Sequence, residues 1–292
     1  MKFTPLTLED KTIFEQYISD DINFENNFAV IYSWAAVIDY EIARLDDALI
    51  LKVNIDGDVF FDTPKTKNKS LDKYIDLCAD YCKKENLTFG MKILEKDFEN
   101  LSPETKSKYK FSLIPNQWDY VYNASELAEF SGRKFQKKRN LLSQFLRKYK
   151  YEFIDYDKTK HYEKILQFQR KWSANDNDNW EFEALKRALD NFEVLNLNCD
   201  IIEIDGEIAA FSISSAPRAD AGEIIFEKGN VDYKGIYAAI VQFSSKKHFS
   251  KCKFINREED MGMENLKKSK QSYNPIMQIK KYSITSKDET NT

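Results

Sequence analysis

The sequence contains little glycine, proline or histidine, and each shortage narrows the class of protein. Eight glycines and six prolines among 292 residues argue against disorder and low complexity. The two histidines, His161 and His248, have no neighbouring cysteine, and the four cysteines lack the spacing of a zinc site, which takes about four nitrogen or sulfur ligands. We therefore expect no metal centre and ordinary reduced thiols.

Long apolar runs are also missing. A helix needs about 18 consecutive apolar residues to cross a bilayer. The longest candidate, residues 28–38, is shorter and contains Tyr32, Ser33 and Trp34. Residues 1–10 lack the basic and then apolar regions of a signal peptide. We expect a cytoplasmic protein, and the sequence leaves peripheral membrane contact and the oligomeric state open.

Basic residues are scarce in the first half of the chain. Residues 1–130 carry 15 lysines and arginines against 24 aspartates and glutamates, a net charge of −9. Residues 131–292 carry 29 against 24, a net charge of +5. An anionic ligand is therefore expected to bind the second half.

The two halves share one order of expected elements. Each shows helices, a meander of three strands, and then a helix, a strand, a helix and a strand. The meanders contain the Asp-Gly turns at residues 56–57 and 205–206, which are strong hairpin signals. This order predicts an α/β fold, of the α+β kind with mixed sheets, in which helices cover each sheet.

The same order predicts two domains. We expect an N-terminal domain over residues 1–122 and a C-terminal domain over residues 123–292. The last strand is expected at residues 275–282, within the second domain. Near the middle of that domain, Trp172 and Trp180 flank a polar loop, where their rings either wall a pocket for an amino-acid side chain or pack at helix ends.

One expected helix, residues 132–150, gathers basic residues. Between Ser131 and Lys150 there are eight lysines and arginines and no acid. On a helical wheel, Lys138 and Arg139 flank the apolar stripe. The polar side chains form either a groove for tRNA or a phosphate-bearing donor, or a solvated surface with one structural Arg–carboxylate pair. The candidate ligand-binding residues here are Arg133, Lys137, Arg139 and Asn140, of which we expect Arg139 to point inward to a carboxylate.

A second charged stretch follows the expected strand that ends at Asn256. In open α/β sheets, ligands gather beyond the carboxyl ends of strands. We expect Asn256, Arg257, Lys267 and Lys270 to bind a ligand there. The alternative is a capped helix with exposed charges.

Four residues near this stretch are candidates for catalysis. Glu227, Glu258 and Asp260 are possible general bases, and the Tyr273 hydroxyl is a possible proton donor. If Arg257, Glu258, Asp260 and Tyr273 converge on one cleft, an enzyme is favoured. If they scatter outward, a binding module is favoured.

Two stretches carry a resemblance to a known family. They are GRKFQKKRN at residues 132–140 and INREEDMGMENLKKSKQSYNP at residues 255–275. The chain resembles, over nearly its whole length, a bacterial family of stand-alone proteins grouped with the phosphatidylglycerol lysyltransferase C-terminal domain. The resemblance implies two tandem acyltransferase-type (GNAT-like) domains.

The resemblance also implies a reaction. Enzymes of the wider clan move an acyl or aminoacyl group from an activated donor, such as aminoacyl-tRNA or acyl-CoA, to an amine or hydroxyl. GNAT enzymes that use acetyl-CoA have a glycine-rich loop after the strand expected here at residues 223–228, but only Gly229 and Gly235 occupy it in this chain. The alternative function is a non-catalytic GNAT-fold module that binds an anionic metabolite or nucleic acid.

Overall fold

The computed structural model describes residues 1–17, 22–173 and 179–287. The chain divides into two compact units, one formed by Met1–Trp118 with Ile279–Thr292, the other by Asp119–Gln278. This division differs from the expected domains, 1–122 and 123–292. The limits of those domains stay a prediction. Most of the polar loop between Trp172 and Trp180 lies outside the described residues.

The first unit contains one mixed sheet. Its strand order is β1-β2-β3-β4-β6-β15-β7, with β5 paired to β3, and β4 runs parallel to β6. The strands are β1 (Thr4–Pro5), β2 (Asp39–Arg44), β3 (Ala48–Ile55), β4 (Asp58–Phe61), β5 (Lys65–Thr66), β6 (Gly90–Leu94), β7 (Tyr109–Leu113) and β15 (Lys281–Ser286). The helices are α1 (Lys11–Glu15), α2 (Phe28–Trp34), α3 (Asp72–Glu85), α4 (Glu95–Glu99) and α5 (Pro103–Lys108).

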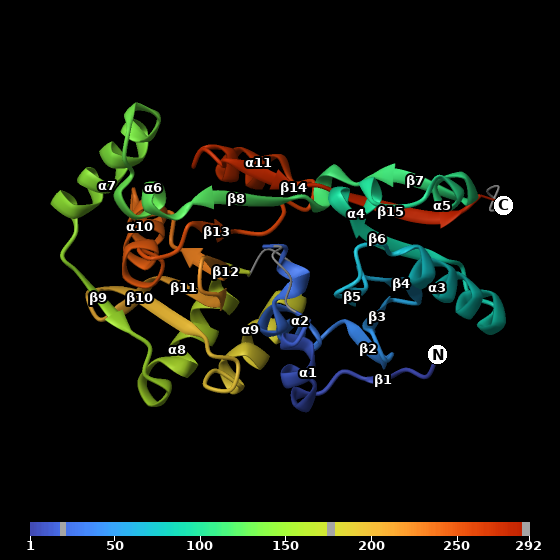
Figure 1. Ribbon diagram of the computed structural model, residues 1–292. Coiled ribbons are helices and arrows are strands. Elements are labelled where there is room, and N and C mark those ends of the chain that lie inside the picture. Colours follow the sequence, from blue (N-terminus) through green and yellow to red (C-terminus); the bar gives the residue numbers. More distant parts are fainter. Residues whose placement is uncertain (18–21, 174–178, 288–292) are drawn as a thin grey trace. The chain divides into compact units, whose positions relative to one another are not determined.

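The second unit contains a second mixed sheet, ordered β14-β8-β13-β12-β11-β10-β9 (Figure 1). The strands are β8 (Asp119–Asn123), β9 (Tyr151–Asp155), β10 (Asn198–Ile204), β11 (Glu207–Arg218), β12 (Ala221–Gly229), β13 (Phe254–Asn256) and β14 (Met277–Ile279). The helices are α6 (Ala124–Glu129), α7 (Gln136–Lys148), α8 (Lys158–Trp172), α9 (Trp180–Asp190), α10 (Ile236–His248) and α11 (Glu264–Gln271). The expected α/β class with two mixed sheets is confirmed.

Both predicted hairpins are confirmed. The β3–β4 turn pairs Ile55 with Asp58, and the β10–β11 turn pairs Ile204 with Glu207. The two residues of each turn have positive φ, 53° and 97° in the first and 53° and 81° in the second. Asp-Gly suits this geometry because glycine has no Cβ and aspartate tolerates the left-handed region.

The end of the chain departs from the sequence prediction. In place of one strand at residues 275–282, the structure has β14 and, after a break at Lys280, β15. β15 lies in the first sheet, where it hydrogen-bonds to both β6 and β7. The second sheet in turn takes in β8 next to β13, from the segment that directly follows the first unit in sequence. The repeated order of elements contained no information about this pairing.

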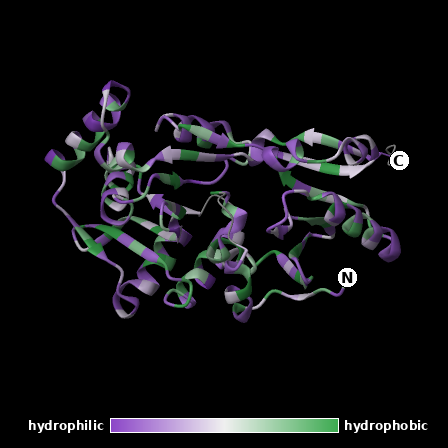
Figure 2. Cartoon of the chain, viewed as in Figure 1, coloured by the Kyte–Doolittle hydropathy of each residue, from purple (hydrophilic) through white to green (hydrophobic). Residues whose placement is uncertain are grey.

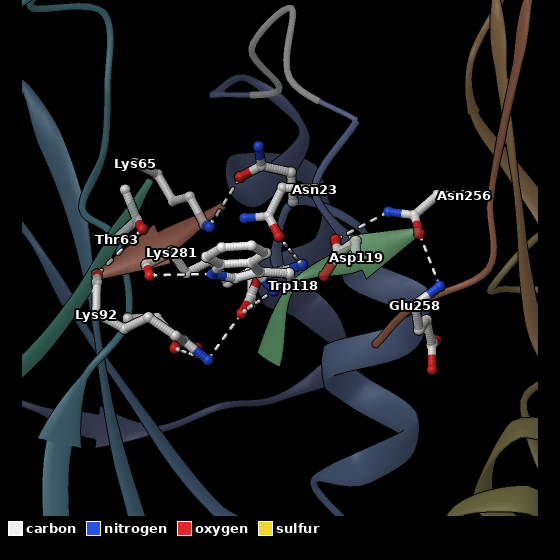
Figure 3. A network of polar contacts seen from close by, with 12 residues as sticks. Asn23, Thr63, Lys65, Lys92, Trp118, Asp119, Asn256, Glu258 and Lys281 are labelled. Atoms are coloured by element: carbon white, nitrogen blue, oxygen red, sulfur yellow. Dashed lines mark hydrogen bonds and ion pairs between the residues drawn. The ribbon is translucent and has the colours of Figure 1, made fainter. Parts of the chain in front are cut away.

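Buried charges hold β15 in the first sheet. Lys281 is fully buried, and its Nζ lies 3.0 Å from Glu25 Oε1, which Lys92 Nζ approaches to 2.7 Å (Figure 3). Burial alone would raise the pKa of Glu25, but Lys281 and Lys92 outweigh burial and lower this pKa to about 2. Buried charges need such partners, so Glu25 makes the first sheet the stable place for Lys281.

The second core lies between its sheet and the helices α6, α7 and α10 (Figure 2). Ile202, Ile204 and Ala210 of the sheet meet Ile240 and Phe145 there. Helices α8 and α9 cover the opposite face, where Phe168 makes an edge-on contact with Phe211. No helix in the described part of the chain is long and apolar enough to cross a membrane.

A substitution at Gly222 on β12 tests how tightly the sheet packs against the end of α10. A Cβ at this position would lie 2.2 Å from the ring of Phe249, which is fully buried. We expect Gly222→Ala to lower the free energy of unfolding by about 1–3 kcal/mol through overpacking. Urea denaturation measures this change. Gly90→Ala is the control, because the new Cβ would make only an ordinary 3.4 Å contact with Phe60, and equal losses in both variants would contradict the account.

Candidate functional site

Strands β12 and β13 form a short parallel pair and then separate. Three residue pairs join them, ending at Glu223 and Asn256. Beyond this point β13 stops, whereas β12 continues to Gly229 while still paired with β11. The side chains that follow the last pair therefore lie beyond the carboxyl end of a parallel pair, which is where open α/β sheets bind ligands.

A buried ion pair links β12 to the residue that directly follows β13. Arg257 Nη2 lies 2.8 Å from Glu227 Oε1, and the two side chains are only 12% and 8% exposed. Among the described residues, neither Arg257 Nη1 nor Glu227 Oε2 has a hydrogen-bond partner. Leaving such atoms buried and unsatisfied costs free energy. The pair therefore offers a ligand one charged donor and one charged acceptor.

The loop after β13 is held in an uncommon backbone conformation. Glu258 and Met261 have φ of 56° and 52°, in the left-handed region that side chains rarely adopt. Asn256 donates to Asp119 at 2.9 Å and accepts from the Glu258 N–H at 2.7 Å (Figure 3). Such strain persists only where surrounding contacts impose it, and it is frequent at functional sites.

Lys270 fixes the same loop from α11. Its buried ammonium donates to the carbonyl oxygens of Arg257 and of Glu258, the latter at 3.1 Å. Burial lowers the pKa of Lys270 to about 8. Lys267, which was expected to share a face with it, is exposed. Lys270 and Asn256 thus position Arg257, rather than presenting their own side chains to a ligand.

The three candidate bases differ in their surroundings. The Asp260 carboxylate accepts from the Tyr120 hydroxyl at 2.7 Å and from the Gly262 N–H at 2.9 Å. Burial, together with the neighbouring Glu223 and Glu259, raises the pKa of Glu258 well above its usual range. Glu227 alone of the three forms an ion pair with Arg257.

Tyr273 and an unexpected residue, Lys138, complete the cluster. The Tyr273 ring is buried, with the Arg257 guanidinium 4.6 Å and the Lys138 Nζ 3.3 Å from its centroid. Lys138 also donates to the Ser272 hydroxyl at 2.7 Å. Burial first, and then Arg257, lower the pKa of Lys138 to about 7, and burial raises the pKa of the Tyr273 phenol.

Lys138 was visible in the sequence only as a residue flanking the apolar stripe of its helix. Nothing in the local pattern showed that Tyr273 would lie over it. A lysine with a pKa near neutrality can accept a proton at physiological pH, which makes it a stronger base candidate than the exposed lysines of the same helix.

The other candidate ligand-binding residues of the basic helix lie on the surface. Arg133, Lys137 and Asn140 are exposed. The inward, carboxylate-paired position expected for Arg139 is wrong: its side chain lies at the surface and donates to the carbonyl oxygens of Phe130 and Gly132. The reason is local, because α6 ends at Phe130 with φ of 46° and leaves carbonyls that need donors.

The loop between β12 and α10 is shaped by packing. Gly235 has φ of 93°, and a Cβ there would lie 2.3 Å from the Leu141 carbonyl oxygen on α7. This glycine is therefore required for the close approach of α10 to α7. Of the residues expected at the site, Arg257, Glu227 and Tyr273 come together, while Asp260 and Asn256 support the loop.

The comparison with protein families identifies the class. Residues 18–285 match the family model described as phosphatidylglycerol lysyltransferase, C-terminal. This match spans most of the chain, so the chain belongs to that family, whose solved neighbours have GNAT-like folds.

Solved structures agree with this assignment. A conserved protein of unknown function from Bacteroides thetaiotaomicron is 28% identical, with a TM-score of 0.90 over 98% of this chain and 100% of that one. L-PGS from Bacillus licheniformis is 14% identical, with a TM-score of 0.69 over 96% and 93%. A tandem GNAT protein from the clavulanic acid biosynthesis pathway is 8% identical, with a TM-score of 0.51 over 99% of both chains. The last two show the fold alone.

Removing one partner of the buried Arg257–Glu227 pair should lower the free energy of unfolding. Glu227→Ala leaves the Arg257 charge buried without its carboxylate, and we expect a loss of about 3–5 kcal/mol in the free energy of unfolding. Lys186→Ala breaks an exposed pair with Asp190 in the same unit and should cost less than about 1 kcal/mol. Chemical denaturation of both variants compares them, and similar small losses would show that the Arg257 charge is not buried.

The lowered pKa of Lys138 can be measured directly. In a chain whose lysines carry ¹³C-methyl groups, the Lys138 signal is assigned by its loss in Lys138→Arg. We expect it to titrate with a midpoint near 7, because burial and the neighbouring Arg257 lower this pKa. A Lys138 midpoint at the usual lysine value of about 10.4 would contradict the lowered pKa and the partial burial that causes it.

Proposed function

We propose that the chain is a tandem GNAT-like transferase that moves an acyl or aminoacyl group from an activated donor to an amine or hydroxyl. The observation that carries this proposal is the Arg257–Glu227 pair, buried where β12 and β13 separate, with one unsatisfied atom on each side chain. The family supports transfer chemistry in general. Residues 1–122 and 123–292 are the proposed GNAT-like domains.

The reaction is a direct attack. The acceptor nitrogen or oxygen adds to the carbonyl carbon of the donor, and the carbonyl oxygen takes up negative charge. Arg257 Nη1 donates a hydrogen bond to this oxygen, and a fixed donor in a water-poor site stabilises such a charge strongly. The intermediate then collapses with loss of the donor's hydroxyl or thiol. No covalent enzyme intermediate is needed.

Lys138 is the proposed proton acceptor. Its pKa near 7 leaves a substantial neutral fraction at physiological pH, so it can take the acceptor's proton as the new bond forms. Glu227, the remaining carboxylate candidate, orients Arg257 and can accept a hydrogen bond from a donor ammonium. Tyr273, buried against both cations, fixes their separation.

Aminoacyl-tRNA is the favoured donor and acyl-CoA the second. The loop before α10 has few glycines, and its Gly235 is used for helix packing rather than for a phosphate cradle. The exposed Arg133, Lys137 and Asn140 on the basic helix suit contacts with an RNA backbone.

Arg257 is the decisive position for this function. Arg257→Lys keeps a charge but loses the planar fork that bonds Glu227 and the donor together. We expect it to reduce donor binding and transfer by at least about 100-fold, as removal of a single oxyanion donor does. The assay is transfer from a panel of aminoacyl-tRNAs and acyl-CoAs.

Lys83→Ala, an exposed change on α3, is the matched control and should retain full activity. If Arg257→Lys were as active as Lys83→Ala, the site assignment would be wrong. Donor binding without turnover by the unaltered chain would instead favour the non-catalytic binding module.

A further inference from the structure

A separate recess lies on the α8 face of the second sheet. It has a volume of about 590 Å³ and is lined by the second half of α8, the start of β11 and the segment that follows β12. Successive residues of a strand point to opposite faces, so Lys228 points toward α8 whereas Glu227 points to the Arg257 pair. The recess is therefore distinct from the proposed reaction site, although Gly229 in its wall lies only two residues from Glu227.

Large flat and apolar side chains form its walls. Phe168, Trp172 and Tyr233 contribute rings, and Val231 an aliphatic surface. Trp172 is 41% exposed and Val231 76% exposed, which is unusual for side chains of this kind. The Lys228 ammonium lies 4.1 Å from the Trp172 ring centroid and is held there by Glu181 at 2.7 Å. The indole is thus fixed in place and still presents area to a ligand.

Two lysines line the same recess. Lys164 and Lys171 lie two turns apart on α8 and thus on one face of the helix. Lys164 Nζ makes two long contacts, each of 3.3 Å, with Glu203 Oε1 and with the Gly206 carbonyl oxygen, which leaves one of its three N–H groups for an anion. Glu207, also in the lining, can accept hydrogen bonds from hydroxyl groups. The rings suit stacking with a nucleobase, the two lysines suit phosphates, and the Glu207 carboxylate suits the hydroxyl groups of a ribose.

We propose that this recess binds an adenine nucleotide, with the base against Trp172 and the phosphates on Lys164 and Lys171. This inference rests on the proposed function, because both kinds of donor carry adenosine, at the 3′ end of a tRNA or in coenzyme A. Base stacking on an aromatic ring and lysine–phosphate contacts are the usual means of holding such groups. The two residues from Glu227 to Gly229 span about 7 Å of strand. The recess and the Arg257 pair thus lie on opposite faces of β12, a short distance apart along the strand.

Calorimetry with two probes tests the site in the whole chain at low salt. The probes are adenosine 3′,5′-bisphosphate, which represents coenzyme A, and the RNA tetranucleotide ACCA, which represents a tRNA end. We expect one of them to bind, Lys171→Glu to weaken it about tenfold or more, and Trp172→Ala to weaken it to a similar degree. Trp172→Phe retains a ring and should restore most of the affinity.

Lys160→Glu is the matched control. It makes the same charge change on the same helix, at a residue that is outside the recess and paired with Asp157. Equal affinity in Lys171→Glu and Lys160→Glu, or no binding of either probe at about 1 mM, would overturn the proposal. Lys83→Ala, an exposed change in the first unit, should leave probe affinity unchanged. Loss of transfer in Arg257→Lys with no effect of Lys171→Glu would reject the recess and retain the transferase.

Discussion

The buried ion pair between Arg257 and Glu227 is the constraint on which the rest of the second unit depends. Glu227 lies on β12 and Arg257 directly follows β13, so the ion pair links the two segments just beyond the point where their pairing ends. Burying two charges is costly unless their remaining atoms are also satisfied. Here one nitrogen and one oxygen are not, among the described residues. A polar ligand that bonded to both atoms would offset this cost.

The surrounding structure can be understood as support for this pair. Asn256 donates a hydrogen bond to Asp119 at the start of the loop. The Lys270 ammonium donates to the carbonyl oxygens of this loop. Tyr273 lies against the guanidinium and brings in Lys138 from a helix over a hundred residues earlier in the sequence. The first unit also contains a buried ion pair, between Lys281 of β15 and Glu25. In both units, buried charge decides which distant segments belong together.

The sequence was most informative where structure is local. The Asp-Gly hairpins and the mixed sheets followed from turn chemistry and from the order of elements. The position of β15 could not be predicted, because strand pairing between distant segments leaves no short-range pattern. At the site, Arg257 and Tyr273 were predicted from the charged stretch after a strand. Lys138 was missed, and Arg139 was given a carboxylate partner, because a helical wheel shows which face is apolar but not what lies opposite it.

The most direct test of the account is a structure of the chain with a non-hydrolysable aminoacyl-adenosine or acyl-CoA analogue bound. The account predicts the carbonyl oxygen of the analogue within about 3 Å of Arg257 Nη1, where β12 and β13 separate. A bound analogue whose carbonyl lies elsewhere, with Arg257 Nη1 still unpaired, would contradict it.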